Sequence, residues 1–162
     1  MNAEIFNVVI LYERLAHVGR AMATYLHLTH GLADDFAPAF RLWRIDRALE
    51  PDHADEAERD IAAAEVIIMA VDGGQPCPSA FQRWTVGAGH GGGPPPHAII
   101  ALIEASVNPA PAAGSWSNIL RNTATQIHSE VFVCDLPSSR DGAALTRPAG
   151  GRFSLPGRGG NF

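Results

Sequence analysis

Lysine is absent from this chain of 162 residues, and all twelve basic residues are arginine. That absence excludes any mechanism that needs a lysine amine, such as a Schiff base or a lysine that holds a phosphate loop. The net charge of −5 leaves no basic surface suited to nucleic acid or to an anionic membrane. We therefore expect neither nucleic acid nor a membrane among its partners.

Cysteine and long apolar runs are equally scarce. The two cysteines, Cys77 and Cys134, are too few for a disulfide framework and lack the spacing of metal ligands. The apolar segments are far shorter than a membrane span, which needs about 20 residues. No basic segment precedes the first apolar run, which argues against a signal peptide. The sequence predicts a reduced, cytoplasmic protein.

Short apolar segments that alternate with helical patterns are the main feature present. The run at Val66–Val71 has no polar alternation, which is typical of a strand covered on both faces. By contrast, Ala37–Ile45 contains Pro38 and two arginines, as edge strands often do. The other predicted strands are Ile5–Leu11, His97–Ile103 and Glu130–Cys134. This order predicts an α/β three-layer sandwich whose doubly wound, five-stranded parallel sheet has the order 2-1-3-4-5.

Helical spacing indicates which residues face the predicted core. In a helix over Arg14–Thr29, the stripe of Leu15, Val18, Met22 and Leu26 is predicted to face inward. Further helices are predicted to begin near Pro51 and near Pro78 or Ser79, and Ser115 is a suitable N-cap for one that ends near His128. In that last helix the inward residues are predicted to be Trp116, Ile119, Leu120, Ala124 and Ile127.

The C-terminal segment differs from the rest in composition. Residues 1–135 are predicted to form the α/β domain, and residues 136–162 a disordered tail rich in Gly, Pro and Arg. Pro148 limits any helix there to about one turn. The sheet face beside Val131 and Val133 is therefore predicted to lack a helical cover, which a homodimer or a protein partner would supply.

One stretch resembles a known family. Ala64-Glu65-Val66-Ile67-Ile68, then Asp72–Pro78, then Phe81–Trp84 are similar to the corresponding segment of flavodoxin-like proteins, in particular the NADPH-dependent FMN reductase group. The resemblance implies an NAD(P)H-dependent oxidoreductase with FMN at the carboxyl edge of the sheet. The residues that it places there are Tyr12, Arg14, Asp72, Gly73, Gly74 and Trp116.

The loop after the first strand departs from that family. Flavodoxin-like enzymes have a loop rich in Ser, Thr and Gly that holds the FMN phosphate on backbone amides, whereas this chain has Tyr12-Glu13-Arg14-Leu15. A carboxylate at Glu13 would repel a phosphate, and Arg14 could partly compensate. The alternative hypothesis is a non-catalytic signalling or protein-interaction module without a cofactor.

The sequence also resembles the receiver domains of response regulators, which share the predicted fold. Asp72 follows the third predicted strand, where receivers carry their phosphoacceptor, and Glu13 follows the first. The position of the receiver hydroxyl is taken by Ile103, and the receiver lysine has no counterpart. Without those groups a phosphoryl charge is poorly stabilised, which favours a receiver-like module over a working receiver.

Each candidate residue also has a structural interpretation. Asp72 is suited to cap the turn at Gly73-Gly74, and Glu13 to face the positive end of a helix. Cys77 is either a reactive thiol or a packed one. Trp116 and Tyr12 either stack on a planar ligand or belong to the margin of the core. The histidines of the first helix are predicted to be exposed, although His27 and His30 share a face that could bind a metal weakly.

Overall fold

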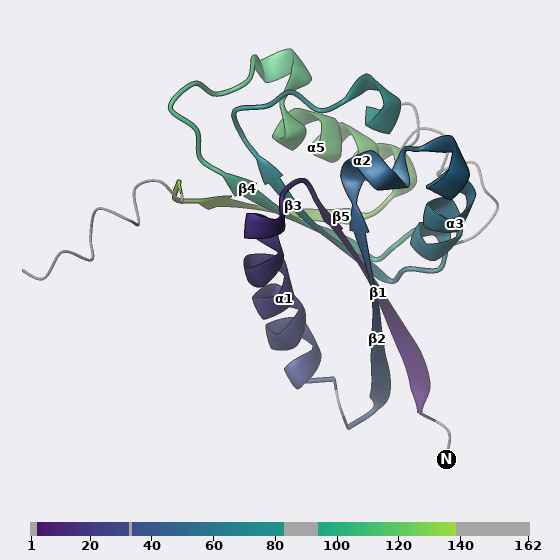
Figure 1. Cartoon of the computed structure of the whole chain (residues 1–162). Coiled ribbons are helices and arrows are strands. Elements are labelled where there is room, and N and C mark those ends of the chain that lie inside the picture. The colour runs from purple at the N-terminus through teal and green to yellow at the C-terminus, as the bar shows by residue number, and fades with distance from the viewer. Residues whose placement is uncertain (1–2, 33, 83–93, 139–162) are drawn as a thin grey trace, which may run out of the picture.

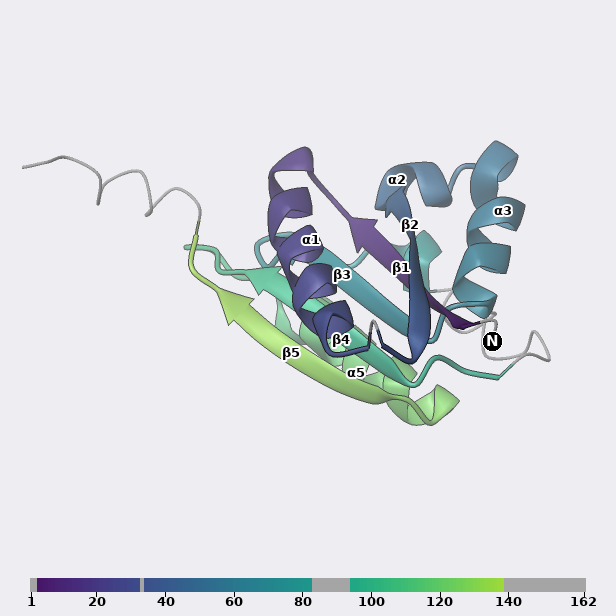
Figure 2. The ribbon, with the colours of Figure 1, turned by 90° about the horizontal axis from the view of Figure 1, so that it is seen from below.

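The computed structural model describes residues 3–32, 34–82 and 94–138. Its strands form one parallel sheet (Figure 1). Their order, β2-β1-β3-β4-β5, can be followed in Figure 2. The bounds are β1 (Glu4–Tyr12), β2 (Phe36–Arg44), β3 (Val66–Asp72), β4 (Ala98–Glu104) and β5 (Glu130–Leu136). The predicted fold class and strand order are confirmed, with β3 in the centre and β2 at an edge.

Helices lie on both faces of the sheet (Figure 2). They are α1 (Leu15–His30), α2 (Ile45–Ala48), α3 (Pro51–Ala62) and α5 (Trp116–Ile127), with a short 3-10 helix η1 (Ala112–Gly114). Residues 79–82 are also helical, as predicted. Pro51 begins α3. The Ser115 hydroxyl accepts a hydrogen bond from the Asn118 N–H at 3.3 Å and caps α5. None of the helices in the described ranges is long and apolar enough to cross a membrane.

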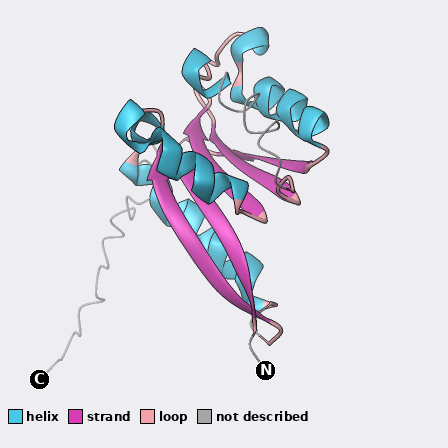
Figure 3. Ribbon diagram, turned by 90° about the vertical axis from the view of Figure 1, so that its right-hand side faces the viewer, coloured by secondary structure: helices cyan, strands magenta, loops and turns pink. Residues whose placement is uncertain are grey.

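Alternate strand residues divide the core into two clusters, one on each face of the sheet. Val9, Met69 and Ala101 face α2, α3 and α5, where Ile45, Ile61 and Leu120 pack against the sheet. On the other face, Ile10, Ile68 and Leu102 point toward α1, which contributes Ala21 and Tyr25. In Figure 3 the sheet lies between these helical layers. We call these two surfaces the α5 face and the α1 face.

The predicted inward stripe of the first helix is wrong for Leu15 and Leu26, although Met22 does pack against the core. The buried residues of α1 are His17, Ala21, Tyr25 and Thr29, which recur every fourth position. Leu15 and Leu26 are 75% and 61% exposed. The buried side of α1 begins at His17, whose Nε2 lies 2.9 Å from the buried Glu104 carboxylate at the edge of the sheet. The inward residues predicted for α5 are correct, since each is buried or packed against the core.

The prediction about the uncovered part of the sheet names the wrong face. Val131 and Val133 pack under α5 on the α5 face. Phe132, between them, points to the α1 face and is 51% exposed. In the part of the chain that the structure describes, α1 packs on β1 and β3 and no helix covers β5 on that face. The predicted tail falls largely outside the described residues, which end at Ser138, and Leu136 belongs to β5.

Candidate functional site

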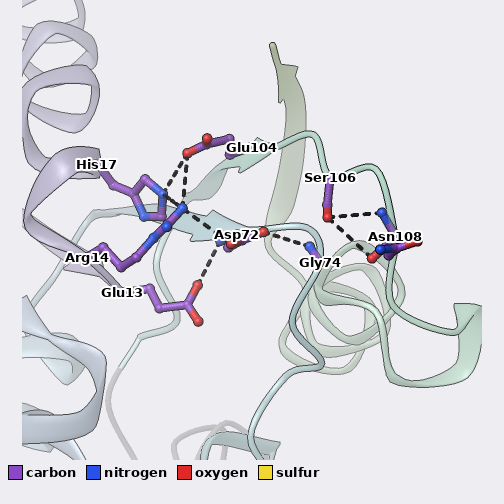
Figure 4. Close-up of polar contacts among 8 residues, drawn as sticks. All are labelled: Glu13, Arg14, His17, Asp72, Gly74, Glu104, Ser106 and Asn108. Atoms are coloured by element: carbon purple, nitrogen blue, oxygen red, sulfur yellow. Dashed lines mark hydrogen bonds and ion pairs between the residues drawn. The ribbon is translucent and has the colours of Figure 1, made fainter. Parts of the chain in front are cut away.

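The carboxyl ends of β1, β3 and β4 bring together a group of polar side chains that we call the edge cluster. Its members are Glu13, Arg14, His17, Asp72 and Glu104 (Figure 4). In a parallel sheet of this order, the strand order reverses between β1 and β3, and ligands bind at that edge. The edge cluster is therefore the candidate functional site.

Glu13 closes the loop between β1 and α1. Its carboxylate accepts a hydrogen bond from the Asp72 N–H at 2.7 Å, and its own N–H donates to the Ala70 carbonyl at 3.1 Å. Glu13 precedes Arg14, the N-cap of α1, and the first turn of that helix holds no acidic residue. The proposed role of Glu13 in facing the helix dipole is therefore wrong, and its carboxylate caps β3 instead.

Arg14 is the cation among these carboxylates. Its guanidinium Nη2 lies 3.3 Å from the Asp72 carboxylate and 3.5 Å from that of Glu104. The side chain is 49% exposed, whereas those of Asp72 and Glu104 are 23% and 8% exposed. Arg14 thus joins the loop after β1 to the ends of β3 and β4 from the solvent side.

His17 and Glu104 form a buried pair that the sequence analysis missed. His17 Nε2 lies 2.9 Å from Glu104 Oε2, and both side chains are less than a tenth exposed. Nδ1 of the same ring is buried without a hydrogen-bond partner among the described residues. The four-residue repeat of His17, Ala21 and Tyr25 was the available signal, but it competed with a more apolar stripe, of which Leu15 and Leu26 are exposed.

Gly73 and Gly74 lie in a turn that Asp72 caps. The Gly74 N–H donates to Asp72 Oδ1 at 2.8 Å, which confirms the proposed Asx turn. A Cβ at Gly73 would lie 2.7 Å from the Glu104 carbonyl oxygen, and one at Gly74 would lie against the Ser106 hydroxyl. The backbone at the end of β4 thus leaves no room for a side chain at Gly73, and the Ser106 side chain occupies the space beside Gly74.

The two aromatic candidates lie in different surroundings. Trp116 is 2% exposed and its ring packs on Phe81, with 5.1 Å between the ring centroids. Its Nε1 has no hydrogen-bond partner among the residues described. Tyr12 is partly buried against the cluster on the α1 face. Stacking of either ring on a ligand stays a prediction, and Trp116 as placed belongs to the core.

Cys77 is a packed thiol. Its side chain is buried in the α5 face cluster, and this burial raises the pKa of the thiol from 9.0 to about 12. A reactive thiolate at this position is therefore excluded near neutral pH. In the described ranges no group of three or more His, Cys, Asp and Glu side chains is arranged to hold a metal ion.

The charges of the edge cluster decide what it can bind. Glu13, Asp72 and Glu104 contribute carboxylates, and Arg14 contributes the guanidinium that bonds two of them. A phosphate dianion placed about 4–5 Å from a carboxylate at a protein surface costs several kcal/mol. The Asp72 N–H already has a carboxylate acceptor. These residues do not fit an FMN phosphate at the loop after β1.

Comparison with known proteins gives likenesses of structure alone. No family model matches the sequence, and no curated protein matches it. A flavo di-iron protein of Thermotoga maritima superposes with a TM-score of 0.51 at 12% identity, over 83% of this chain and 31% of that protein. A WrbA-like flavodoxin of Agrobacterium tumefaciens gives a TM-score of 0.47 at 18% identity, over 79% of this chain and 76% of that one.

Proposed function

We propose that this chain, which has a flavodoxin-like fold, works as a non-catalytic protein-interaction module. The observation that carries the proposal is the hydrogen bond from the Asp72 N–H to the Glu13 carboxylate at 2.7 Å. An internal carboxylate thereby takes a backbone donor at the edge where flavodoxin-like enzymes hold a phosphate. The guanidinium of Arg14, which could otherwise pair with a phosphate, likewise forms ion pairs with the carboxylates of Asp72 and Glu104.

An FMN-dependent oxidoreductase is the second candidate. It is favoured by the likeness to a solved structure described as a flavo di-iron protein and by the half-exposed guanidinium of Arg14, which a phosphate could reach. It requires Arg14 to leave two carboxylates and Glu13 to leave the Asp72 N–H. We rank it second because each of those changes leaves a carboxylate near the incoming dianion.

The experiment that separates the two candidates is a titration of FMN fluorescence with the purified full-length protein. We expect no saturable quenching of the wild type up to about 1 mM protein, which corresponds to a binding free energy weaker than about 4 kcal/mol. A yellow protein on purification, or quenching that saturates at micromolar protein, would overturn the proposed module in favour of the flavoprotein.

Glu13→Ser and Glu58→Ser form the matched pair of variants. Glu58 is an exposed residue of α3, away from the edge cluster. If Glu13 is what excludes a phosphate, Glu13→Ser is the only one of the two that gains measurable FMN affinity. Equal gains in both variants would mean that net charge, rather than the position of Glu13, controls FMN binding.

A further inference from the structure

The two edge strands of the sheet differ in how they are protected against further pairing. An exposed edge strand offers unpaired backbone donors and acceptors, and proteins block such edges with proline and with positively charged residues. β2 carries Pro38 together with Arg41 and Arg44. β5 reads Glu-Val-Phe-Val-Cys-Asp-Leu and contains neither proline nor a basic residue. It is the outermost strand on its side of the sheet (Figure 2).

We propose that β5 is a self-association edge, where β5 of a second copy of this chain pairs antiparallel. This inference rests on the proposed function, and it names the partner of the module. The two strands would be related by a two-fold axis at Val133, which extends the parallel sheets of both copies into one continuous sheet. A two-fold interface presents the same surface from both copies, so that surface must complement itself.

The apolar residues of β5 meet this requirement. In the antiparallel register centred on Val133, Phe132 lies opposite Cys134 of the second copy. Both side chains are exposed on the α1 face, and Phe132 is 51% exposed. The same register sets Val131 opposite Asp135, so no like charges face each other. Pairing would shield the flank of Phe132 that the described chain leaves in solvent.

Opposite charges lie at opposite ends of the strand. Glu130 is exposed at the beginning of β5. At the other end, Nη1 of Arg20, a residue of α1, donates to the carbonyl of Pro137 at 3.3 Å. An antiparallel second copy brings each Glu130 beside the Arg20 of the other copy. A parallel neighbour would bring Glu130 beside Glu130, which favours the antiparallel arrangement.

Sedimentation equilibrium of the full chain from about 1 to 200 μM tests the proposal at the affinities of transient interfaces. We expect a mass that rises with concentration toward twice 17.2 kDa. Phe132→Lys should weaken the association at least tenfold. Phe40→Lys is the matched control, because Phe40 is 44% exposed on the other edge strand. A monomer throughout this range, or dissociation by Phe40→Lys instead, would overturn the proposal.

A charge exchange and a truncation complete the test. Glu130→Arg should weaken the dimer, and adding Arg20→Glu to that variant should restore it. Failure of the restoration would overturn the antiparallel register. A chain that ends at Ser138 should dimerise within threefold of the full chain. If only the shortened chain dimerises, residues 139–162 block the edge, and the second copy is not the occupant. None of these outcomes depends on FMN, so they are separate from the titration above.

Discussion

The two faces of the sheet are covered to different extents. The α5 face packs against α2, α3 and α5, whereas in the described ranges the α1 face packs against α1 alone. The buried charged groups follow the same division. Among the described residues, His17 and Glu104 lie on the side of α1, and the buried polar side chain on the α5 face is that of Thr123. The face with less apolar cover thus holds the edge cluster and the exposed Phe132. The larger apolar core and the proposed recognition surface therefore lie on opposite sides of one sheet.

The largest expected effect is at the centre of the α5 face. Leu120 is 1% exposed in α5, and Leu120→Ala should lower the free energy of unfolding by about 2–5 kcal/mol because it leaves a cavity with closed walls. Leu28→Ala, at a partly buried position on the α1 face, should cost roughly half as much. Urea unfolding followed by circular dichroism measures both. Equal losses would mean that the two faces are packed alike.

The next effect concerns the buried pair on the side of α1. His17→Ala and Glu104→Ala should each cost about 2–4 kcal/mol, since each removes a hydrogen-bond partner from a buried polar side chain. The double variant should lose about 1–3 kcal/mol less unfolding free energy than the sum of the two single losses, and this difference is the coupling free energy of the pair.

The control for that cycle is the exposed ion pair between Arg47 and Glu50, at 3.1 Å. Its coupling free energy should stay below about 0.5 kcal/mol, as for most surface pairs. Additive losses for His17 and Glu104 would contradict the pairing seen at the edge of the sheet.

The smallest expected effect is a loss of stability at alkaline pH. It is tested by comparing Cys77 on the α5 face with Cys134 on the α1 face. In the fold the pKa of the Cys77 thiol is raised from 9.0 to about 12, so the folded protein keeps a proton that the unfolded chain releases. The stability from this group is complete below pH 9 and is lost as the pH rises toward 12. At pH 10 the loss should be about 1 kcal/mol.

Urea unfolding at pH 7 and pH 10 measures this loss. Cys77→Ala should remove this part of the alkaline destabilisation, whereas Cys134→Ala, at an exposed position on the α1 face, should retain it. The same alkaline loss in wild type and Cys77→Ala would show that the thiol is not buried in its protonated form.

The elements that the sequence predicts well are those whose signal is local. The uninterrupted apolar run Val66–Val71 predicted a central strand, and Pro38, which lacks a backbone N–H, predicted an edge strand for β2. Both signals are contained within a few residues of sequence, and the observed sheet order agrees with them. The short helix α2 was not predicted, and the strand was extended through Ile45, which instead begins that helix and packs into the core.

The edge cluster was only partly predictable. Asp72, Gly73 and Gly74 form the turn that their sequence indicates. On the buried side of α1, His17 pairs with Glu104, which lies 87 positions away in the chain, and hydrophobic periodicity contains no information about such a pair. Trp116 differs, because helical spacing alone predicts that it faces inward, and the structure buries it against Phe81.

The register of the strands also has a consequence for how the chain folds. Glu4 pairs with Phe36, Val66 with Ala98, and Ala98 with Glu130, so three of the four pairings span 32 positions. The fourth, Val8 with Val66, spans 58 and joins β1–β2 to β3–β4–β5. Closing the longest loop has the largest entropic cost. We expect β1–β2 and β3–β4–β5 to form separately before they dock. Substitutions of side chains that pack between β1 and β3 should therefore give lower φ-values than substitutions of those that pack between β3 and β4. Equal φ-values would indicate that the sheet condenses in one step.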